Sequence, residues 1–282
     1  MPTTHSPLRY PGGKTKLKSI ASNIFSQNNL IDGTYVEPFA GGAGLAIFLL
    51  INGLAKNIIL NDLDRSIYAL WYSVLNDANN LCKKISRTKI TIAEWEKQKQ
   101  IQLNKENSDL FELGFSTLFL NRTNRSGIIN GGIIGGYSQS GKYKIDARFN
   151  KADIIRKIQL IYLYKSKINI FNLDAIEFLN TINFAAPQKT LINLDPPYYL
   201  KGQKLYQNFY THDDHSYLSY LIPTIKPYWM ITYDNVEPIR KLYCQFPHYE
   251  YKLSYTAQSR YHGKEILIVD PRLKFTPGKF MF

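Results

Sequence analysis

Cysteine and long apolar runs are scarce in this chain of 282 residues. The two cysteines, Cys82 and Cys244, lie far apart, which fits a reducing cytosol and no metal framework. The longest apolar run, residues 45–51, is far shorter than the roughly 20 residues that cross a bilayer. Residues 1–11 are polar and show no apolar stretch of the kind that a secretory signal requires. We therefore expect a cytoplasmic protein that does not span a membrane.

Acidic residues are also in short supply. The chain has 22 Asp and Glu against 35 Lys and Arg, a net charge of +13. A surplus of this size favours a polyanionic partner, which is nucleic acid or an anionic membrane surface. Residues 75–167 hold 17 of the basic and 8 of the acidic residues, so they carry +9 of the total. We expect the nucleic-acid contacts there, although a solvated charged face is the alternative.

A glycine-rich turn follows the first predicted strand. Residues 34–39 predict a strand and residues 45–54 a helix, with Ala40-Gly41-Gly42-Ala43-Gly44 between them. Glycines at such a turn let the backbone approach a nucleoside. Ile47 stands where the dinucleotide fingerprint requires its third glycine, which favours a ligand without a pyrophosphate. Residues 57–62 predict a second strand that ends in Asp62, at a spacing typical of an acid that binds ribose hydroxyls. The alternative role of Asp62 is to cap the helix predicted over residues 67–74.

Gly13-Lys14-Thr15 resembles the end of a phosphate-binding loop. That motif requires a glycine where Leu8 stands and a strand before it, and both are missing, so we exclude nucleotide hydrolysis of this type. A turn that leads into a helix over residues 16–25 can still present Lys14 to a ligand carboxylate. The alternative is a plain helix start.

The alternation of strands and helices stops between residues 75 and 167. Residues 90–120 predict helix, and glycines then bracket short apolar pieces over residues 121–144, as in a hairpin or an ordered loop. Arginine, asparagine and tyrosine around these glycines are typical of contacts with phosphates and base edges. We therefore expect an inserted subdomain that reads nucleic acid.

The strand and helix pattern resumes at residue 167. Residues 167–174 predict a strand that ends in Asp174, which can accept from an adenine amino group or cap its own helix, with equal weight. A helix through residue 221, a strand over 228–233 and a helix over 236–243 follow. Residues 249–256 and 265–269 predict a closing antiparallel hairpin. His212 to His215 lack a third ligand of matching spacing, so we expect a helix cap at Thr211 or Asp213 and no metal.

The most specific segment is Asp195-Pro196-Pro197-Tyr198. It ends a short apolar run, residues 191–194, which predicts a buried parallel strand that the prolines terminate. Open α/β sheets bind ligands at the carboxyl ends of such strands. The Asp195 carboxylate and a neighbouring carbonyl can point at one guest, and Tyr198 offers a face on which a nucleobase can stack. An ordinary proline turn is the alternative.

Together these segments resemble a known family. The sequence is similar to Dam-type DNA N6-adenine methyltransferases, and the similarity covers nearly the whole chain. The matching segments, in one order, are Pro11-Gly12-Gly13-Lys14, Glu37-Pro38-Phe39-Ala40-Gly41-Gly42-Ala43-Gly44, Asn61-Asp62, Asn121-Arg122, Asp195-Pro196-Pro197-Tyr198 and Thr232-Tyr233-Asp234-Asn235. At residues 128–132 the chain departs from the best-known GATC-specific members, so the resemblance does not define the recognition sequence.

The resemblance implies a fold, an activity and an organisation. The fold would be α/β, a Rossmann-like S-adenosylmethionine-dependent methyltransferase sheet with an antiparallel C-terminal hairpin and an inserted, mainly helical recognition subdomain. Residues 1–74 would form the cofactor-binding half, 75–167 the DNA target-recognition subdomain and 168–282 the catalytic half. The expected activity is site-specific transfer of methyl from S-adenosylmethionine to N6 of an adenine flipped out of double-stranded DNA. The alternatives are transfer to cytosine N4, transfer to RNA adenine, and a non-catalytic DNA-binding relative; the leading Asp195 favours adenine over cytosine.

The resemblance also assigns residues and partners. The expected catalytic residues are Asp195, Pro196, Pro197 and Tyr198. The expected cofactor-binding residues are Tyr10, Lys14, Glu37, Phe39, Gly41, Gly42, Gly44, Asp62, Asp174 and Asp195. The expected DNA-binding residues are Arg122, Asn124, Arg125, Tyr137, Lys142 and Arg148. We expect a monomer of prokaryotic or phage type that uses S-adenosylmethionine and no metal, with a cognate restriction enzyme as a candidate partner.

Overall fold

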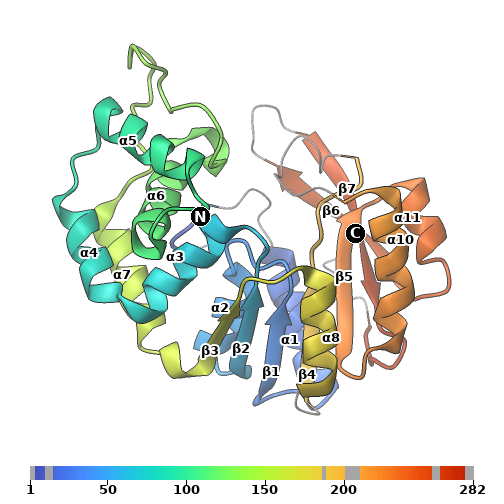
Figure 1. Cartoon of the computed structure of the whole chain (residues 1–282). Coiled ribbons are helices and arrows are strands. Elements are labelled where there is room, and N and C mark those ends of the chain that lie inside the picture. The colour runs from blue at the N-terminus through green and yellow to red at the C-terminus, as the bar shows by residue number, and fades with distance from the viewer. Residues whose placement is uncertain (1–3, 10–14, 186–188, 201–209, 256–260, 277–282) are drawn as a thin grey trace. The chain divides into compact units, whose positions relative to one another are not determined.

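The computed structural model describes residues 4–9, 15–185, 189–200, 210–255 and 261–276 (Figure 1). Tyr10 and Lys14, two of the expected cofactor-binding residues, lie outside these ranges. The chain forms two compact units. The first comprises Met1–Thr4, Gly12–Leu63 and Lys167–Phe282, and the second comprises His5–Pro11 and Asp64–Ser166. Each unit is described below by itself.

A seven-stranded sheet forms the centre of the first unit. Its order is β3-β2-β1-β4-β5-β7-β6. The first five strands in the chain are parallel: β1 (Gly33–Glu37), β2 (Ala55–Asn61), β3 (Ile168–Phe171), β4 (Thr190–Leu194) and β5 (Tyr228–Asp234). The last two, β6 (His248–Tyr255) and β7 (Tyr261–Val269), form an antiparallel hairpin that joins the sheet through β7. The expected Rossmann-like sheet with an antiparallel C-terminal hairpin is thereby confirmed.

Helices cover both faces of this sheet because its strands are apolar on both sides. All five residues of β1 and all five of β4 are buried, as parallel central strands require. On one face, α8 (Ala175–Ala185), α10 (His212–Leu221), the short η3 (Ile222–Thr224) and α11 (Glu237–Leu242) bury a core that includes Trp229. On the other face, α2 (Gly44–Ile51) packs on β1 and β2, and α1 (Thr15–Gln27) packs on α2. Complete burial of one large apolar side chain stabilises the fold by roughly 1.5–3 kcal/mol.

The second unit is helical. Its helices are α3 (Arg65–Asn76), α4 (Ala78–Arg87), α5 (Ile92–Leu103), α6 (Leu110–Thr123) and α7 (Lys151–Tyr162), and the short η2 (Lys165–Lys167) follows. The helix expected over residues 90–120 is two helices, because the Asp109 carboxylate accepts from the Phe111 and Glu112 amides and begins α6. The longer segment of this unit begins at Asp64, so α3 belongs to it, whereas the division expected from the sequence places residues 64–74 in the first part.

Helices α3 and α6 approach each other closely at Gly114. A Cβ atom at this position would lie 2.4 Å from the Ala69 carbonyl oxygen and 2.4 Å from Ser73 Oγ, both on α3. Real side chains do not approach this closely, so only glycine permits this crossing. The core of the second unit therefore depends on the missing side chain.

An ordered loop connects α6 to α7 through the glycine-rich residues. The short η1 (Arg125–Gly127) follows α6, and one antiparallel bridge joins Asn124 to Ile133. Residues 121–150, which the structure describes in full, contain no strand, so of the two expected forms, a hairpin or an ordered loop, the ordered loop is observed. Among the described helices, none is long and apolar enough to cross a membrane.

Candidate active site

The strand order reverses between β1 and β4, which lie side by side. From β1 the order runs through β2 and β3 on one side and from β4 through β5 on the other. A crevice at the carboxyl ends of the strands accompanies such a reversal in open α/β sheets, and ligands bind there. The glycine-rich turn follows β1 and Asp195 follows β4. The fold thus brings the predicted cofactor turn and the predicted catalytic segment to the same edge of the sheet.

The glycine-rich turn is held by Asp62. Gly41 (φ 46°) and Ala43 (φ 46°) both adopt the left-handed conformation, and α2 begins directly afterwards. The Gly41 amide donates to Asp62 Oδ2 at 2.8 Å. The N-cap of α3 is Asp64, whose carboxylate accepts from the Ser66 amide. The alternative role of Asp62 as a helix cap is therefore not observed, and its carboxylate lies at the turn.

Asn61 joins the ends of three strands. Its side-chain amide donates to the carbonyls of Pro38 and Leu173 at 3.0 Å each, and its Oδ1 accepts from the Leu173 amide at 3.0 Å. The Ala40 amide also donates to the Asn61 main-chain oxygen at 2.9 Å. The segments after β1, β2 and β3 are thus fixed relative to each other, and Asp62 and Asp174 are fixed with them.

Glu37 ends β1 and is 5 % exposed. The hydroxyl of Tyr35 donates to Glu37 Oε1 at 3.2 Å. Burial, and then the Glu37 charge, raise the pKa of Tyr35 well above its ordinary value, so the phenol stays protonated and remains a donor. The Glu37 carboxylate is therefore held in a defined position at the end of β1.

Asp174 caps its own helix. Its Oδ1 accepts from the amides of Ile176 at 2.8 Å and Glu177 at 3.4 Å, at the start of α8. Both bonds use one oxygen, so the capping role and a contact with an adenine amino group are compatible. Close to this carboxylate, Tyr210 packs edge-on against Phe39, with 5.7 Å between ring centroids. The buried Tyr210 hydroxyl has no hydrogen-bond partner among the described residues.

The Asp195 carboxylate is oriented by the neighbouring strand. Thr232 on β5 donates its hydroxyl to Asp195 Oδ1 at 2.7 Å. Asp195 is half-buried, and Pro196 and Pro197 behind it are buried. A carboxylate held in this way is preorganised to accept hydrogen bonds from a bound group.

Two acids hold the residues that follow the prolines. Asp234, the last residue of β5, accepts the Tyr199 amide on Oδ1 at 2.9 Å and the Leu200 amide on Oδ2 at 3.0 Å. Glu265 on β7 accepts the hydroxyl of Tyr198 on Oε1 at 2.5 Å. The backbone and the aromatic ring of this segment are therefore each tied to the antiparallel side of the sheet.

A cluster of rings packs beneath the segment. His215 on α10 is fully buried, its Nδ1 lies 2.8 Å from the Tyr233 hydroxyl, and its ring packs against Tyr199 and Tyr210. Burial lowers the pKa of His215 to about 4, so the imidazole is neutral at physiological pH. Helix α10 begins at a capping box of Thr211 and Asp214, so Thr211 and not Asp213 is the cap, one of the two that we expected. The described residues contain no group of three potential metal ligands.

In the second unit, two of the expected DNA-binding residues hold the loop from inside. Asn124 is fully buried; its amide donates to the carbonyls of Ile128 and Ile129, and its Oδ1 accepts from the Trp95 indole. Arg122 donates to the Pro7 carbonyl from both Nε and a terminal nitrogen. Burial, and then the nearby Arg9 charge, lower the pKa of Arg122 to about 10. These two side chains position the loop and its neighbour segment.

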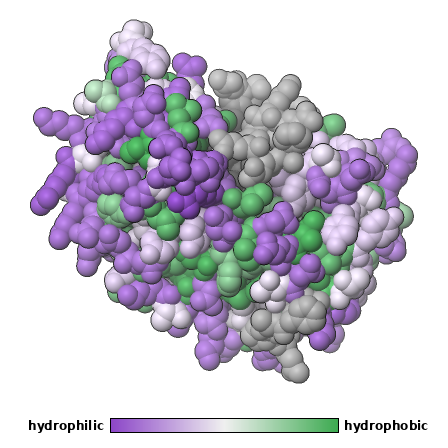
Figure 2. All heavy atoms as spheres, in the orientation of Figure 1, coloured by the Kyte–Doolittle hydropathy of each residue, from purple (hydrophilic) through white to green (hydrophobic). Residues whose placement is uncertain are grey.

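The other expected DNA-binding residues lie on the surface of the same loop. Arg125, Lys142 and Arg148 are exposed, and Tyr137 is 60 % exposed. The Tyr137 ring packs edge-on against the Trp95 ring, with 5.8 Å between ring centroids. This contact fixes one side of the Tyr137 ring, and the other side stays accessible. Hydrophilic residues also cover much of this unit on the face drawn in Figure 2. The loop thus presents three cations and an aromatic ring on a supported backbone.

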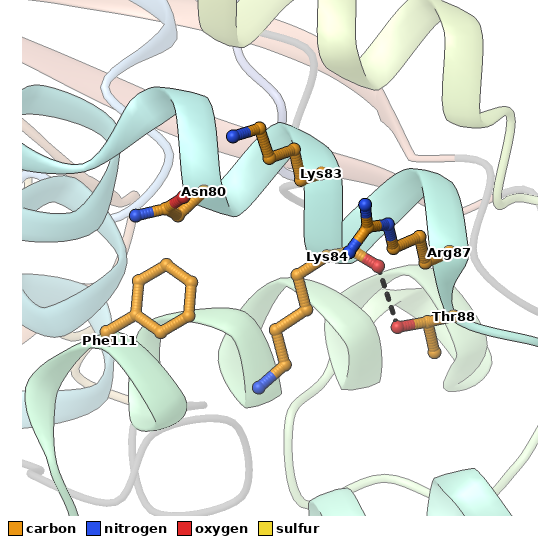
Figure 3. A pocket seen from close by; sticks show the side chains of 6 residues that line it. All are labelled: Asn80, Lys83, Lys84, Arg87, Thr88 and Phe111. Carbon is orange, nitrogen blue, oxygen red and sulfur yellow. Dashed lines mark hydrogen bonds between the residues drawn. The ribbon is translucent and has the colours of Figure 1, made fainter.

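A separate basic hollow of about 400 Å³ lies between α4 and α6 (Figure 3). Its lining residues are Asn80, Lys83, Lys84, Arg87, Thr88 and Phe111. Lys84 is paired with Glu112 at 2.5 Å and lies over the Phe115 ring. None of the predicted site residues lines this hollow, and Lys84, one of its three cations, is already paired with an acid, so it is not the candidate active site.

Three contributors to the site were not assigned a role from the sequence. Asp234 ends a strand, as Asp62 and Asp195 do, so the same signal could have identified it. Tyr210 carries no local signal, because its place against Phe39 depends on the packing of α10. Glu265 cannot be found from sequence, because its contact with Tyr198 depends on the register of β7 beside β5.

The fold and the site define a class of protein. A mostly parallel seven-stranded sheet with an antiparallel C-terminal hairpin, and a glycine-rich turn beside an acid at its carboxyl edge, is the Rossmann-like methyltransferase fold. Residues 10–257 match the family of D12 class N6 adenine-specific DNA methyltransferases, and the chain belongs to this family. It is an enzyme, a DNA adenine methyltransferase. Membership implies S-adenosylmethionine as methyl donor and DNA as substrate.

Two curated relatives are similar at low identity. The Type II methyltransferase M.MjaIII of Methanocaldococcus jannaschii is 26 % identical over 206 residues, which cover 68 % of each chain. The Type II methyltransferase M.CviBI of Paramecium bursaria Chlorella virus NC1A is 26 % identical over 250 residues, which cover 88 % of this chain and 90 % of the relative. Both names agree with the family.

Proposed function

We propose that this chain is a Dam-type methyltransferase that methylates N6 of an adenine flipped out of duplex DNA, with Asp195 to Tyr198 as its catalytic segment. One observation carries the proposal: the Asp195 carboxylate, held by Thr232 at 2.7 Å, ends the strand next to the one that leads into the Gly41 turn. An acceptor site for an amine and a candidate cofactor site thus share one edge of the sheet.

The chemistry explains why an acid followed by prolines suits this reaction. The adenine amine is a poor nucleophile because its lone pair is delocalised into the ring. If the Asp195 carboxylate and the Pro196 carbonyl each accept an N6 hydrogen, the nitrogen moves towards tetrahedral geometry and its lone pair is localised. S-adenosylmethionine supplies an electrophilic methyl group on a sulfonium. The residues contribute orientation and electrostatics, and the amine releases a proton after it has become cationic.

Tyr198 has a distinct role in this proposal. Flipping a base out of the duplex costs a few kcal/mol, because stacking and pairing are lost. Stacking of the flipped adenine on the Tyr198 ring returns roughly 1–3 kcal/mol, which is of the size needed to offset that loss. Tyr198 is half-buried, so part of its surface is available to a base.

The described residues fit the methyl donor. Gly41 and its neighbours Gly42 and Gly44 let the backbone approach the methionine part, and Asp62 is placed for the ribose. Asp174 Oδ2, which takes no part in the cap of α8, would accept from the adenine amino group. Glu37 at the end of β1 and Phe39 just after it would line the site, with Asp195 at the methyl end. Tyr10 and Lys14, the other two residues expected to bind the cofactor, lie outside the described ranges.

We assign DNA recognition to the second unit. Arg125, Lys142 and Arg148 would contact phosphates, and Tyr137 would contact a base or sugar. Arg122 and Asn124 would act through the loop that they hold. A Lys142→Ala variant should bind duplex DNA more weakly, with a salt slope of log K against log salt that is shallower by about 1. Lys56→Ala, which removes an exposed cation on β2, is the matched control; an unchanged slope for Lys142→Ala would remove that residue from the interface.

The names of the two relatives bear on the biological setting. Both are Type II methyltransferases, which supports the proposal that this enzyme protects the sites of a cognate restriction enzyme. We propose that it acts as a monomer, since one chain carries both the transfer site and a candidate recognition loop.

The test is methylation with labelled donor. The protein is incubated with duplex DNA and methyl-labelled S-adenosylmethionine, the DNA is digested and the labelled nucleoside is identified. Label in N6-methyldeoxyadenosine is expected, and sequencing of the marked sites would give the target. Label in N4-methyldeoxycytidine would move the acceptor, and label in RNA alone would refute duplex DNA as substrate.

Asp195→Ala tests the catalytic assignment. Transfer should fall by more than about 100-fold, because a preorganised acceptor at the reacting nitrogen is lost. Cofactor affinity, measured by calorimetry, should change little. Asp213→Ala, which removes an exposed acid on α10, is the control. Equal loss of transfer and cofactor affinity in Asp195→Ala would contradict the role given to Asp195.

A further inference from the structure

We infer that Glu265 is a positioning residue that orients the ring of Tyr198 before DNA binds. The inference rests on the proposed function, in which Tyr198 stacks on the flipped adenine, and adds a residue from the antiparallel hairpin to that site. It follows from the pairing of β5, β7 and β6 and from the hydrogen bonds of three directly paired residues, Asp234, Glu265 and Tyr251.

The row crosses the sheet from β5 to β6. Asp234 on β5 pairs with Glu265 on β7, and Glu265 pairs with Tyr251 on β6. Directly paired residues on neighbouring strands lie on the same face of a sheet. Asp234 is 9 % exposed, and Glu265 and Tyr251 are 2 % exposed. Two acids and a phenol therefore line up, shielded from solvent, where buried acids are uncommon unless they are hydrogen-bonded.

Each acid of the row holds a different part of the catalytic segment. Asp234 accepts the amides of Tyr199 and Leu200, which fixes the backbone. Glu265 accepts the Tyr198 hydroxyl on Oε1 and the Tyr251 hydroxyl on Oε2, both at 2.5 Å. The Tyr251 bond fixes the carboxylate, and the carboxylate fixes the tip of the Tyr198 ring.

This arrangement has a physical consequence for base binding. A half-exposed tyrosine without a partner samples several rotamers, and it loses that freedom when a base stacks on it. A hydrogen bond from its hydroxyl to a buried carboxylate removes the freedom in advance. The flipped adenine then meets a ring that is already oriented, as the alignment of N6 with the Asp195 carboxylate requires.

The experiment compares single-turnover methyl transfer at the target site found by the labelling assay. Tyr198→Phe keeps the ring and removes the tether, and Glu265→Ala removes the acceptor. Each should slow transfer about tenfold, the size expected for loss of a hydrogen bond to a charged group, with cofactor affinity within about twofold of wild type. Glu265→Gln, which still offers an oxygen to the phenol, should recover most of the rate.

Two comparisons separate positioning from a general effect on folding. The double variant Tyr198→Phe with Glu265→Ala should be no slower than either single variant, because both remove one interaction. Tyr249→Phe makes the same chemical change on β6, but Tyr249 pairs with Leu267 and not with Glu265; its rate should match wild type. Fluorescence of 2-aminopurine at the target position should rise in Tyr198→Phe complexes relative to wild type, because a loosely held ring quenches a flipped base less.

Different outcomes would refute the proposed function and the role of Glu265. Absence of labelled N6-methyldeoxyadenosine with the wild-type protein would refute the proposed function itself. An active wild-type protein with Tyr198→Phe transfer within about twofold of it would overturn the role of Glu265 alone. Additive effects in the double variant would overturn it as well. If Glu265→Ala does not fold, Tyr198→Phe and Glu265→Gln still decide the question.

Discussion

Replacement of Asp234 by asparagine is the smallest change that tests how the catalytic segment is held. The aspartate uses both oxygens, one for the Tyr199 amide at 2.9 Å and the other for the Leu200 amide at 3.0 Å. Asparagine has the same shape but carries an NH₂ group in place of one oxygen. In either orientation, that donor faces a backbone N–H that is itself a donor. At least one of the two bonds must be lost, and the remaining one no longer involves a charge.

The magnitude follows from the type of bond. A hydrogen bond to a charged group contributes about 1.5–3 kcal/mol, so the held conformation of the segment should lose about 2 kcal/mol. At 1.4 kcal/mol for each factor of ten, local opening becomes roughly 30 times more frequent. This loss should be confined to the segment, because the Val236 amide donates to the main-chain carbonyl of Asp234 and not to its side chain.

Hydrogen–deuterium exchange at single-residue resolution measures this directly. The amides of Tyr199 and Leu200 should exchange roughly 30-fold faster in Asp234→Asn than in wild type, and the Val236 amide should be unaffected. Exchange of both test amides within about threefold of wild type would show that the side chain does not hold the segment. A uniform acceleration that includes Val236 would show general destabilisation and would also refute the local argument.

Two further predictions concern stability. His215 has a pKa of about 4 in the folded protein and about 6.5 when unfolded, so between these values the unfolded chain binds more protons. Lowering the pH from 7 to 4 should therefore remove about 3 kcal/mol of unfolding free energy that His215→Gln retains. Equal pH slopes in urea titrations of the two proteins would contradict this. Gly114→Ala should lower the unfolding free energy by about 1–3 kcal/mol, because its Cβ meets the Ala69 carbonyl at 2.4 Å. Gly132→Ala, which meets nothing within 4 Å, should be near neutral in the same denaturant assay.

Local patterns were enough to predict the strands, whereas the Rossmann-like sheet was predicted from the family resemblance. Each strand that leads into the site is a short apolar run followed by an acid or a glycine, and such runs are legible without knowledge of their neighbours. The turn at Gly41, the acid Asp62 and the segment from Asp195 to Tyr198 were predicted as site residues in this way, and the strand order brings them to one edge. The antiparallel closing hairpin was found from alternation and spacing alone.

What could not be predicted depends on distant contacts. The sequence leaves Asp62 as either a ribose ligand or a helix cap, and only the structure shows that Asp62 accepts the Gly41 amide while Asp64 caps α3. Asn124 has the polar character of a DNA-contacting residue, but the indole of Trp95, 29 residues earlier in the chain, binds it inside the loop. Glu265 acquires its role from the register of β5, β6 and β7. Such residues are polar, buried and satisfied by partners that no local window contains.

The chain leaves the sheet at Leu63 and returns at Lys167, between the neighbouring parallel strands β2 and β3. Under the proposed assignment of DNA recognition to this inserted unit, its exchange for another would alter the target sequence and leave the transfer residues in place. The exchange cannot be a simple cut at these two points. Arg122 donates a hydrogen bond to the Pro7 carbonyl. The Asn121 side chain accepts from the Arg9 amide and donates to the Arg9 carbonyl. A chimera that keeps these contacts must therefore take residues 5–9 from the same donor protein as residues 64–166, so the second unit is inherited in two pieces of sequence.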